Sequence, residues 1–366
     1  MNNNEDNNKD HRVNASNENF LHYDQVEKTQ RYRLAESAGD EAFDDEFKVR
    51  CCDMGLWFDG GESGKAAFAQ ELGEALEEIG FAILTGHRID PSIHFHAEEA
   101  ARDLFLSRPL AEKIEHRAER CGSVSQGYFP IEETSDIHPD LVEGWVFCRR
   151  AFRMPGSPLM DDVNDYASIW PAPQLEPRFR SLVEANEKLI LPIMQSMLRY
   201  LGAEPHLYDD RLSNPNIGLR LNYYPPIKSK EEETPPGRLL GHEDVGMFVF
   251  LPAPSVEGLQ VLNRANMKWV RLDAPPGSII LNTGDYMQLI SNDRLPSTTH
   301  RVSAPRNSED RELERLTMPM NVYLWEDEML EPLAELGSAK YDPIKAITFH
   351  TRSTAKFYGD DYAVNE

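Results

Sequence analysis

The sequence predicts a mainly β protein with flanking helices. From about residue 216 onward, short β-rich runs recur between Pro, Gly and Asn turns, a spacing typical of antiparallel sandwiches and barrels. Upstream of that point, apolar residues fall at helical spacing, most clearly within residues 176–201. A last run around residues 342–358 predicts a closing helix. The 366 residues are enough to bury a sizeable core.

The first part of the chain is polar. Residues 1–45 are Asn-rich, charged and poor in branched apolar residues, so we expect a disordered polar tail there. Order is expected to begin at the alternating, strand-like run FKVRCCDMGLWF (47–58). The region 46–210 is expected to be rich in helices that pack on the β core.

Apolar periodicity places the elements of this region. Helices are expected over residues 63–79, 92–107 and 176–201. Gly80 and Gly202 follow the first and the third of them and suit C-caps. FAILTG (81–86) is a short apolar run that predicts a buried strand.

The β core is expected over residues 211–330, followed by a C-terminal helical segment over 331–366. The runs that predict its strands are IGLRLNYYPP, MFVFLP, GLQVLN, MKWVRLDA, GSIILNTGD, THRVSAP and TMPMNVYLWED. Their short, regular spacing favours an antiparallel sandwich or barrel over alternating strand–helix units.

The composition argues against several classes of partner. There are 38 basic and 62 acidic residues, a net charge of −24, which repels nucleic-acid phosphates and anionic membrane surfaces. No apolar run approaches the roughly 20 residues of a membrane helix, and the N-terminus lacks the features of a signal peptide. Cys51, Cys52, Cys121 and Cys148 show no CxxC spacing and are expected to be reduced thiols. We therefore expect a cytoplasmic protein.

One short segment combines an imidazole with a carboxylate. In GHEDVGMFVFLP, His242 and Asp244 lie two residues apart, so in a strand their side chains point to the same face. His300 is the other histidine of the β region. Two histidines and one carboxylate suit Fe(II) and oxygen chemistry because they leave coordination positions open, whereas a structural zinc site uses four protein ligands. The alternative is a polar strand end that faces solvent.

Several segments together resemble one known family. RLNYYPP (220–226), GHEDVGMFVFLP (241–252), VEGLQVLN (256–263) and PPGSIILNTGDYMQLISNDRLPSTTHRV (275–302) follow, in order, the core of the 2-oxoglutarate- and Fe(II)-dependent oxygenases of the isopenicillin N synthase-like branch. Upstream, EEIGFAILTGHRI, GYFPIEE and DLVEGWVF are similar to that family's N-terminal segments. The resemblance covers about residues 48–350 and implies a double-stranded β-helix (jelly-roll) core.

The resemblance also implies roles for individual residues. His242, Asp244 and His300 would bind the iron. The family holds the distal carboxylate of 2-oxoglutarate with an Arg-x-Ser pair, and Arg315 and Thr317 stand in this position. Arginine offers a fixed fork of donors for a carboxylate, and a hydroxyl two residues on shares the same strand face.

The stretch between His300 and Arg315 is longer than is usual in the family, which a charged hairpin insertion would explain. Arg306 and Arg311 are alternatives to Arg315, although neither is followed by a hydroxyl leading into an apolar strand. The next positions beside the cosubstrate would be Tyr224 and Asn222; the alternative is that both are ordinary strand residues before the Pro-Pro turn.

The function that follows is oxidation of a small-molecule substrate with O2, by hydroxylation, desaturation or ring closure, with release of succinate and CO2. Two alternatives remain open: an Fe(II) oxidase that does not use 2-oxoglutarate, and a jelly-roll protein that binds a ligand without turnover. The expected partner is a small molecule, with the protein a monomer or homodimer. By family position, the substrate pocket would include Phe248, Tyr128, Trp145 and Phe147; burial in the core is the alternative for each. The segment around Phe357 is expected either to cover the site or to form a dimer contact.

Overall fold

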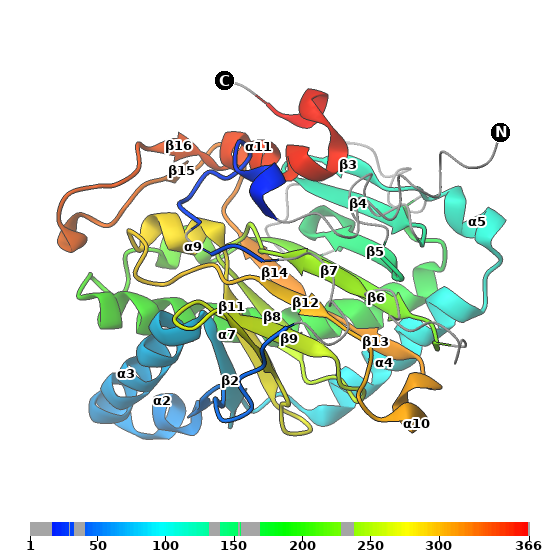
Figure 1. Cartoon of the computed structure of the whole chain (residues 1–366), viewed down its shortest axis with the longest axis horizontal. Helices are drawn as coiled ribbons and strands as arrows, with labels where there is room; N and C mark the ends of the chain where they lie inside the picture. Colours follow the sequence, from blue (N-terminus) through cyan, green and yellow to red (C-terminus); the bar gives the residue numbers. More distant parts are fainter. Residues whose placement is uncertain are drawn as a thin grey trace.

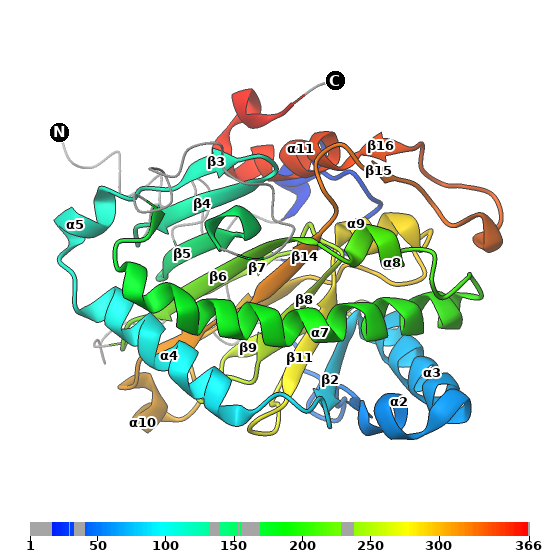
Figure 2. The same ribbon diagram turned by 180° about the vertical axis from the view of Figure 1, so that it is seen from behind.

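The computed structural model describes residues 17–28, 30–32, 41–131, 140–152, 154, 169–227 and 238–364. Two β-sheets face each other at its centre, and a layer of helices covers the outer face of the larger sheet (Figures 1 and 2). The long helix α7 (Glu176–Leu201) crosses this face, with α3 (Gly61–Ile79) and α4 (Pro91–Leu106) packed against it. No helix in the described part of the chain has the length and apolar character needed to cross a membrane.

The larger sheet has ten strands within the described ranges. In spatial order these are β1 (Cys51–Asp53), β2 (Phe81–Thr85), β11 (Ile279–Thr283), β8 (Phe248–Pro252), β14 (Met320–Tyr323), β6 (Asn216–Tyr224), β5 (Glu143–Cys148), β4 (Val124–Phe129) and β3 (Glu119–Cys121), with β13 (Arg315–Thr317) also paired to β6. Apart from the β1–β2 pair, which is parallel, the pairing is antiparallel, as the recurring short runs predict.

The smaller sheet has four strands among the described residues, in the order β10 (Lys268–Arg271), β9 (Leu259–Asn263), β12 (His300–Val302) and β7 (Leu239–His242). Between the two sheets, Val261 and Leu259 of β9 pack with Phe81 of β2 and Ile280 of β11. This apolar cluster joins the sheets on one side. Beside it, the space between the sheets opens into the cavity described in the next subsection.

The expected boundary near residue 210 is wrong as a structural division. Strand β5 of the N-terminal region pairs along its whole length with β6, and β2 pairs with β11. Residues 46–210 therefore supply both helices and strands of the larger sheet. The strands pair because alternating apolar residues on β5 and β6 require the same two buried faces.

Most predicted helices are confirmed. α3 ends at Gly80 and α7 ends at Gly202, both with left-handed backbone (φ 75° and 82°), which glycine adopts without steric cost. The closing helix is α11 (Ala346–Tyr358). The remaining helices are short: α2 (Gly55–Asp59), α5 (Leu110–Ile114), α8 (Asp209–Leu212), α9 (Asp285–Ile290), α10 (Ser308–Arg311), and the 3-10 turns η1 (Asn17–Phe20), η2 (Arg149–Ala151), η3 (Pro173–Leu175), η4 (Ala334–Leu336) and η5 (Asp360–Tyr362).

The run FKVRCCDMGLWF is a strand only over its middle three residues. Its last part, GLWF, begins α2. The expected C-terminal helical segment is helical only in its second half, where η5 lies against α11. Residues 331–343 are irregular apart from η4, and the two-residue strands β15 (Met329–Leu330) and β16 (Ile344–Lys345) pair with each other across them.

The expected disordered tail is wrong for its described part. Residues 17–28 and 30–32 lie against the body of the protein, and Phe20, Val26 and Tyr32 are buried. Phe43 forms a β-bridge with Trp269 of β10. The sparse apolar residues of this segment are buried one by one, although its average composition is polar. Residues 1–16, 29 and 33–40 lie outside the described residues.

The core under α7 contains an aromatic stack. The rings of Phe147 and Trp170 are parallel, with centroids 3.9 Å apart, and Phe179 of α7 lies 6.0 Å from Phe147. All three side chains are fully buried or nearly so. Stacked aromatic rings contribute through buried area and through ring–ring contact.

Phe147→Ala should therefore lower the free energy of unfolding by about 3–5 kcal/mol, because it leaves a cavity between Trp170 and Phe179. Urea denaturation would measure the change. Phe95→Ala is a matched control, since Phe95 is 59% exposed and its loss should change stability by less than about 0.5 kcal/mol. Equal effects of the two substitutions would contradict this account of the core.

Candidate functional site

Three potential metal ligands meet between the sheets. His242 ends β7 and lies directly opposite His300 of β12 in the antiparallel register, and Asp244 follows two residues after His242. One ligand atom from each residue lies within 4.8 Å of the others. The centres of the two imidazole rings are 4.4 Å apart, and Nε2 of His300 is 3.4 Å from Oδ2 of Asp244. Cross-strand pairing thus brings together residues that are far apart in the chain.

The protein fixes the direction of each ligand. Nδ1 of His242 lies 2.8 Å from the carbonyl of Leu240, and Nδ1 of His300 lies 3.1 Å from that of Thr298. When Nδ1 of each ring carries the proton, its N–H donates a hydrogen bond to the carbonyl. The lone pair of Nε2 is then left to bind a metal. Burial and the neighbouring His300 lower the pKa of His242 to about 4, which keeps it neutral at physiological pH.

Asn282 holds the carboxylate of the cluster. Its Nδ2, on strand β11 of the larger sheet, donates a hydrogen bond of 2.8 Å to Oδ2 of Asp244. Asn282 was not among the residues predicted from the sequence. Its position on an apolar strand, IILNT, is the signal that was available, because a buried amide requires a polar partner.

The cavity beside this cluster extends along the inner face of the larger sheet. It is lined by residues that include His242, Asp244, His300, Asn282, Asn222, Tyr224, Arg315, Thr317, Arg220, Asp140, Tyr323, Phe129, Val146, Val249 and, from the C-terminal segment, His350, Thr354, Phe357, Tyr358 and Tyr362. The three ligand residues and the four expected cosubstrate residues therefore share one cavity.

Arg315 is buried at one end of this cavity with unused donors. It is 1% exposed, and its Nε donates to the carbonyl of Val256 over 3.1 Å. Its two terminal nitrogens, Nη1 and Nη2, have no hydrogen-bond partner within the described part of the chain. Buried guanidinium groups without partners are costly, so this end of the cavity is suited to an anion.

Strand register places the other expected cosubstrate residues beside Arg315. Tyr224 pairs with Arg315, and Asn222 pairs with Thr317. The guanidinium carbon lies 5.0 Å from the centre of the Tyr224 ring, and Nδ2 of Asn222 is 3.4 Å from Oγ1 of Thr317. All four side chains line the same cavity because i and i+2 residues share a strand face.

The two alternatives to Arg315 lie elsewhere. Arg306 is largely exposed and pairs with Glu257, and Nε of Arg311 donates to the carbonyl of Pro305. Neither residue lines the cavity. The insertion before Arg315 forms the short helix α10 instead of the expected hairpin.

The substrate-pocket residues expected from the sequence do not lie where they were expected. Phe248, Tyr128, Trp145 and Phe147 are 0% exposed and belong to the core beneath the helices. None of them lines the cavity, whereas their strand neighbours Phe129, Val146 and Val249 do. Successive strand residues point to opposite faces, so the aromatic residues pack on the helical layer and their neighbours face the cavity.

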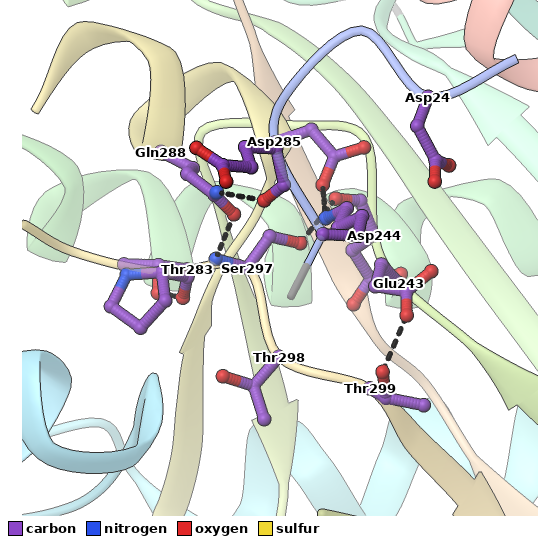
Figure 3. A network of polar contacts seen from close by, with 12 residues as sticks. Asp24, Glu243, Asp244, Thr283, Asp285, Gln288, Ser297, Thr298 and Thr299 are labelled. Carbon is purple, nitrogen blue, oxygen red and sulfur yellow. Dashed lines mark hydrogen bonds and ion pairs between the residues drawn. The ribbon is translucent and has the colours of Figure 1, made fainter. Parts of the chain in front are cut away.

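A polar network surrounds the loop that carries Asp244, and Figure 3 shows several of its residues. Glu243, between the ligands His242 and Asp244, accepts a hydrogen bond of 2.5 Å from Thr299 Oγ1, next to His300. The backbone N–H of Asp285 donates to the carbonyl of Asp244 over 2.8 Å. Thus each ligand has a neighbour within this network.

The N-terminal segment 17–32 forms part of this network. Lys28 Nζ is 2.6 Å from Oδ1 of Asp285, and both side chains are almost fully buried. The hydroxyl of Tyr32 donates a hydrogen bond of 3.1 Å to Glu243. Gln288, close to Asp285, donates to the carbonyl of Glu27 over 2.9 Å.

The C-terminal helix completes the network. Lys356 Nζ of α11 lies 3.9 Å from Glu243 and 4.0 Å from Asp24. Burial by itself would raise the pKa of Glu243, but Lys28 and Lys356 outweigh burial and lower that pKa to about 2. Two lysines from opposite ends of the chain therefore hold one ionised glutamate between the ligands.

Comparison with known proteins gives a consistent result. Residues 215–320 match the model of the 2OG-Fe(II) oxygenase superfamily, and residues 49–173 match that of the non-haem dioxygenase in morphine synthesis N-terminal region. The chain is 30% identical over 287 residues to 2-oxoglutarate-dependent dioxygenase 11 of Oryza sativa subsp. japonica, covering 76% of this chain and 74% of that one. It is 27% identical over 327 residues to a 2-oxoglutarate-Fe(II) type oxidoreductase of Metarhizium rileyi, covering 80% of this chain and 83% of that one.

Solved structures have the same fold. A Neurospora crassa protein in complex with alpha-KG and thymine superposes with a TM-score of 0.72 at 21% identity, covering 89% of this chain and 100% of that one. The dioxygenase for auxin oxidation from rice superposes with a TM-score of 0.64 at 24% identity, covering 82% of this chain and 92% of that one. The two-sheet core is thus a double-stranded β-helix.

Lys28→Met should destabilise the protein by about 3–5 kcal/mol, because it leaves the carboxylate of Asp285 buried without its cation. Urea denaturation would measure this change. Lys340→Met is the control, since Lys340 pairs with Asp293 at the surface with its side chain 53% exposed, and such pairs contribute at most about 1 kcal/mol. If both substitutions cost the same, the N-terminal segment is not held by a buried ion pair.

Proposed function

Given that the chain belongs to the 2OG-Fe(II) oxygenase superfamily, we propose that His242, Asp244 and His300 are the ligands of its Fe(II). The protein is an oxidoreductase that oxidises a small-molecule substrate with O2 and 2-oxoglutarate, releasing succinate and CO2. The observation that carries the ligand assignment is the convergence of three donor atoms within 4.8 Å at one wall of the cavity.

The donor set fits Fe(II). His242, His300 and Asp244 would supply two imidazole nitrogens and one carboxylate oxygen, a donor set that suits Fe(II) and would leave coordination positions for a keto acid and oxygen. The Nδ1 contacts of both imidazoles to backbone carbonyls and the bond from Asn282 to Asp244 orient this set before a metal arrives. When bound, the metal supplies the oxygen chemistry, and the protein supplies the geometry around it.

Arg315 is proposed to bind the distal carboxylate of 2-oxoglutarate. Its Nη1 and Nη2 form a fork with no partner in the described residues, which matches the two oxygens of a carboxylate. The hydroxyl of Thr317 is a further donor on the same strand face, two residues away. Tyr224 and Asn222 complete the wall beside this pair through their register with β13.

The other residues of the cavity would keep water away from the reacting atoms. Phe129, Val146 and Val249 contribute apolar wall to the cavity that contains the ligand cluster. Phe357 and Tyr358 of α11 also line this cavity, which favours a role for the C-terminal segment at the site over a dimer contact. A closed, apolar site strengthens the hydrogen bonds and ion pairs inside it.

The relatives favour the use of 2-oxoglutarate over the two alternative functions. The Neurospora crassa protein has been solved with alpha-KG bound, and a dioxygenase for auxin oxidation from Arabidopsis thaliana has been solved with 2-oxoglutarate. The Neurospora crassa protein has also been solved with thymine. By analogy, the substrate of this chain is a small ring compound. A cytoplasmic location and a monomeric or homodimeric state remain predictions.

His242→Ala should abolish Fe(II) binding. We would add Fe(II) and then 2-oxoglutarate to the anaerobic apoprotein and record the visible charge-transfer band of the keto acid on iron. The band should form with the unchanged protein and with His96→Ala, whose imidazole is exposed outside the cavity. A band that persists in His242→Ala would contradict the ligand assignment, and its absence from the unchanged protein would contradict the proposed iron site.

Arg315→Met should raise the Kd of 2-oxoglutarate roughly 30-fold or more, because truncating one partner of a buried charge pair costs about 2 kcal/mol or more. Titration of the same visible band would give this Kd. Arg306→Met is the control, since Arg306 is exposed and pairs only with surface carboxylates. A larger effect of Arg306→Met than of Arg315→Met would reverse the assignment.

A further inference from the structure

Arg220 places an additional cation in the cavity that neither the metal nor the cosubstrate assignment uses. It lies on β6 in the inward-facing row formed by Gly218, Arg220, Asn222 and Tyr224, all of which line the cavity. Tyr224 pairs with Arg315 at one end of this row, and Gly218 pairs with Asn321 at the other. At roughly 3.3 Å per residue, the backbone of Arg220 lies about 13 Å from that of Tyr224.

The guanidinium of Arg220 is held in place and still has free donors. Its Nε donates to Oδ1 of Asn222 over 2.8 Å, and its carbon lies 5.3 Å from the centre of the Phe129 ring. Among the described residues, no carboxylate lies within ion-pair distance of it. Several other arginines do have such partners: Arg149 pairs with Glu187, Arg150 with Glu326, Arg211 with Glu328 and Arg301 with Glu41. Arg315, the other arginine of the cavity, has none among the described residues.

One acidic side chain of the cavity interacts with Arg220 through its charge. Asp140 lines the same cavity and accepts a hydrogen bond of 2.8 Å from the backbone N–H of Leu240. Burial raises the pKa of Asp140 to about 7, although that hydrogen bond and the charge of Arg220 act in the opposite direction. Near neutral pH Asp140 is therefore only partly ionised, and it offsets only part of the charge of Arg220.

The surroundings of Arg220 are apolar and aromatic. Phe129, Val124 and Val146 line the cavity on its side of the sheet, and Phe357 and Tyr358 reach it from α11. The guanidinium lies directly beside Gly144 of the neighbouring strand, since a Cβ at that position would be in ordinary contact with Nη2 of Arg220 at 3.4 Å. At Gly218, a Cβ would meet Val124 and Tyr323 at 3.2 and 3.4 Å, so glycine keeps this part of the wall open.

We propose that Arg220 binds a carboxylate of the substrate, and that the substrate is a small organic acid with a ring or apolar body. The cation fixes the acid group beside Asn222, and the apolar wall receives the body, which places the substrate alongside the ligand cluster. This inference rests on the proposed function, because it takes the cavity of His242, Asp244 and His300 as the place of reaction.

The test compares acids with amides of the same shape. Binding of benzoate, phenylacetate and indole-3-acetate, and of the matching amides, would be measured by anaerobic calorimetry on the protein loaded with Fe(II) and 2-oxoglutarate. At least one acid should bind roughly ten- to hundredfold more tightly than its amide, because hydrogen bonds to a charged partner contribute about 1.5–3 kcal/mol. Arg220→Met should remove this preference, and Arg220→Lys should retain part of it.

Two controls separate this inference from other outcomes. Arg220→Met should leave the Kd of 2-oxoglutarate, measured by the visible band, within about threefold of its original value. A rise as large as that of Arg315→Met would place Arg220 in the cosubstrate site and overturn the inference. Equal binding of acids and amides, an unchanged preference in Arg220→Met, or no binding of any acid would also overturn it. If the visible band forms while the acid preference is absent, the inference fails and the proposed function stands; if no band forms, the proposed function fails by itself.

Discussion

The antiparallel pairing of β7 with β12 is the constraint on which the rest of the site depends. It sets His242 directly opposite His300 at the edge of the smaller sheet, and the chain then needs only two more residues to bring Asp244 alongside. A slip of one residue in this register would turn one imidazole to the opposite face. The hydrogen bonds from Asn282 to Asp244 and from Thr299 to Glu243 keep the loop after β7 in this geometry.

The distribution of charge inside the protein opposes the charge of the whole chain. The net charge is −24, yet the cavity contains Arg315 and Arg220, and Arg238 is buried close to Arg315. Burial and the charge of Arg315 lower the pKa of Arg238 to about 10, so it stays protonated at neutral pH. The acidic surface repels anions at long range, whereas the guanidinium groups inside bind them at short range. An anion that fits the cavity is therefore favoured over one that does not.

The sequence predicts the elements better than it predicts which side chain faces where. Glycines at 80 and 202 mark helix ends because only the local backbone decides them. For Trp145 and Phe147, family position suggested the cavity, but the alternation of β5 turns these residues to the helices and Val146 inward. The same alternation predicts that Arg220 faces the cavity, because it lies two residues before Asn222 on one strand. The order of the N-terminal segment could not be predicted from its polar composition, because Lys28 is buried only through its pairing with Asp285, which lies 257 positions away.

The two ends of the chain meet at the back of the metal site. Tyr23 donates to Asp360 over 2.9 Å, and Lys356 approaches Asp24 and Glu243, while the blue N-terminal segment lies beside the red α11 in Figure 1. Glu243, which lies between two of the ligands in the sequence, therefore has its full set of partners only when both the N-terminal segment and α11 are docked. Undocking of either element would remove one lysine from this buried carboxylate and leave its charge less compensated beside the metal ligands. The two elements thus couple the metal site to parts of the protein that contribute no ligand to it.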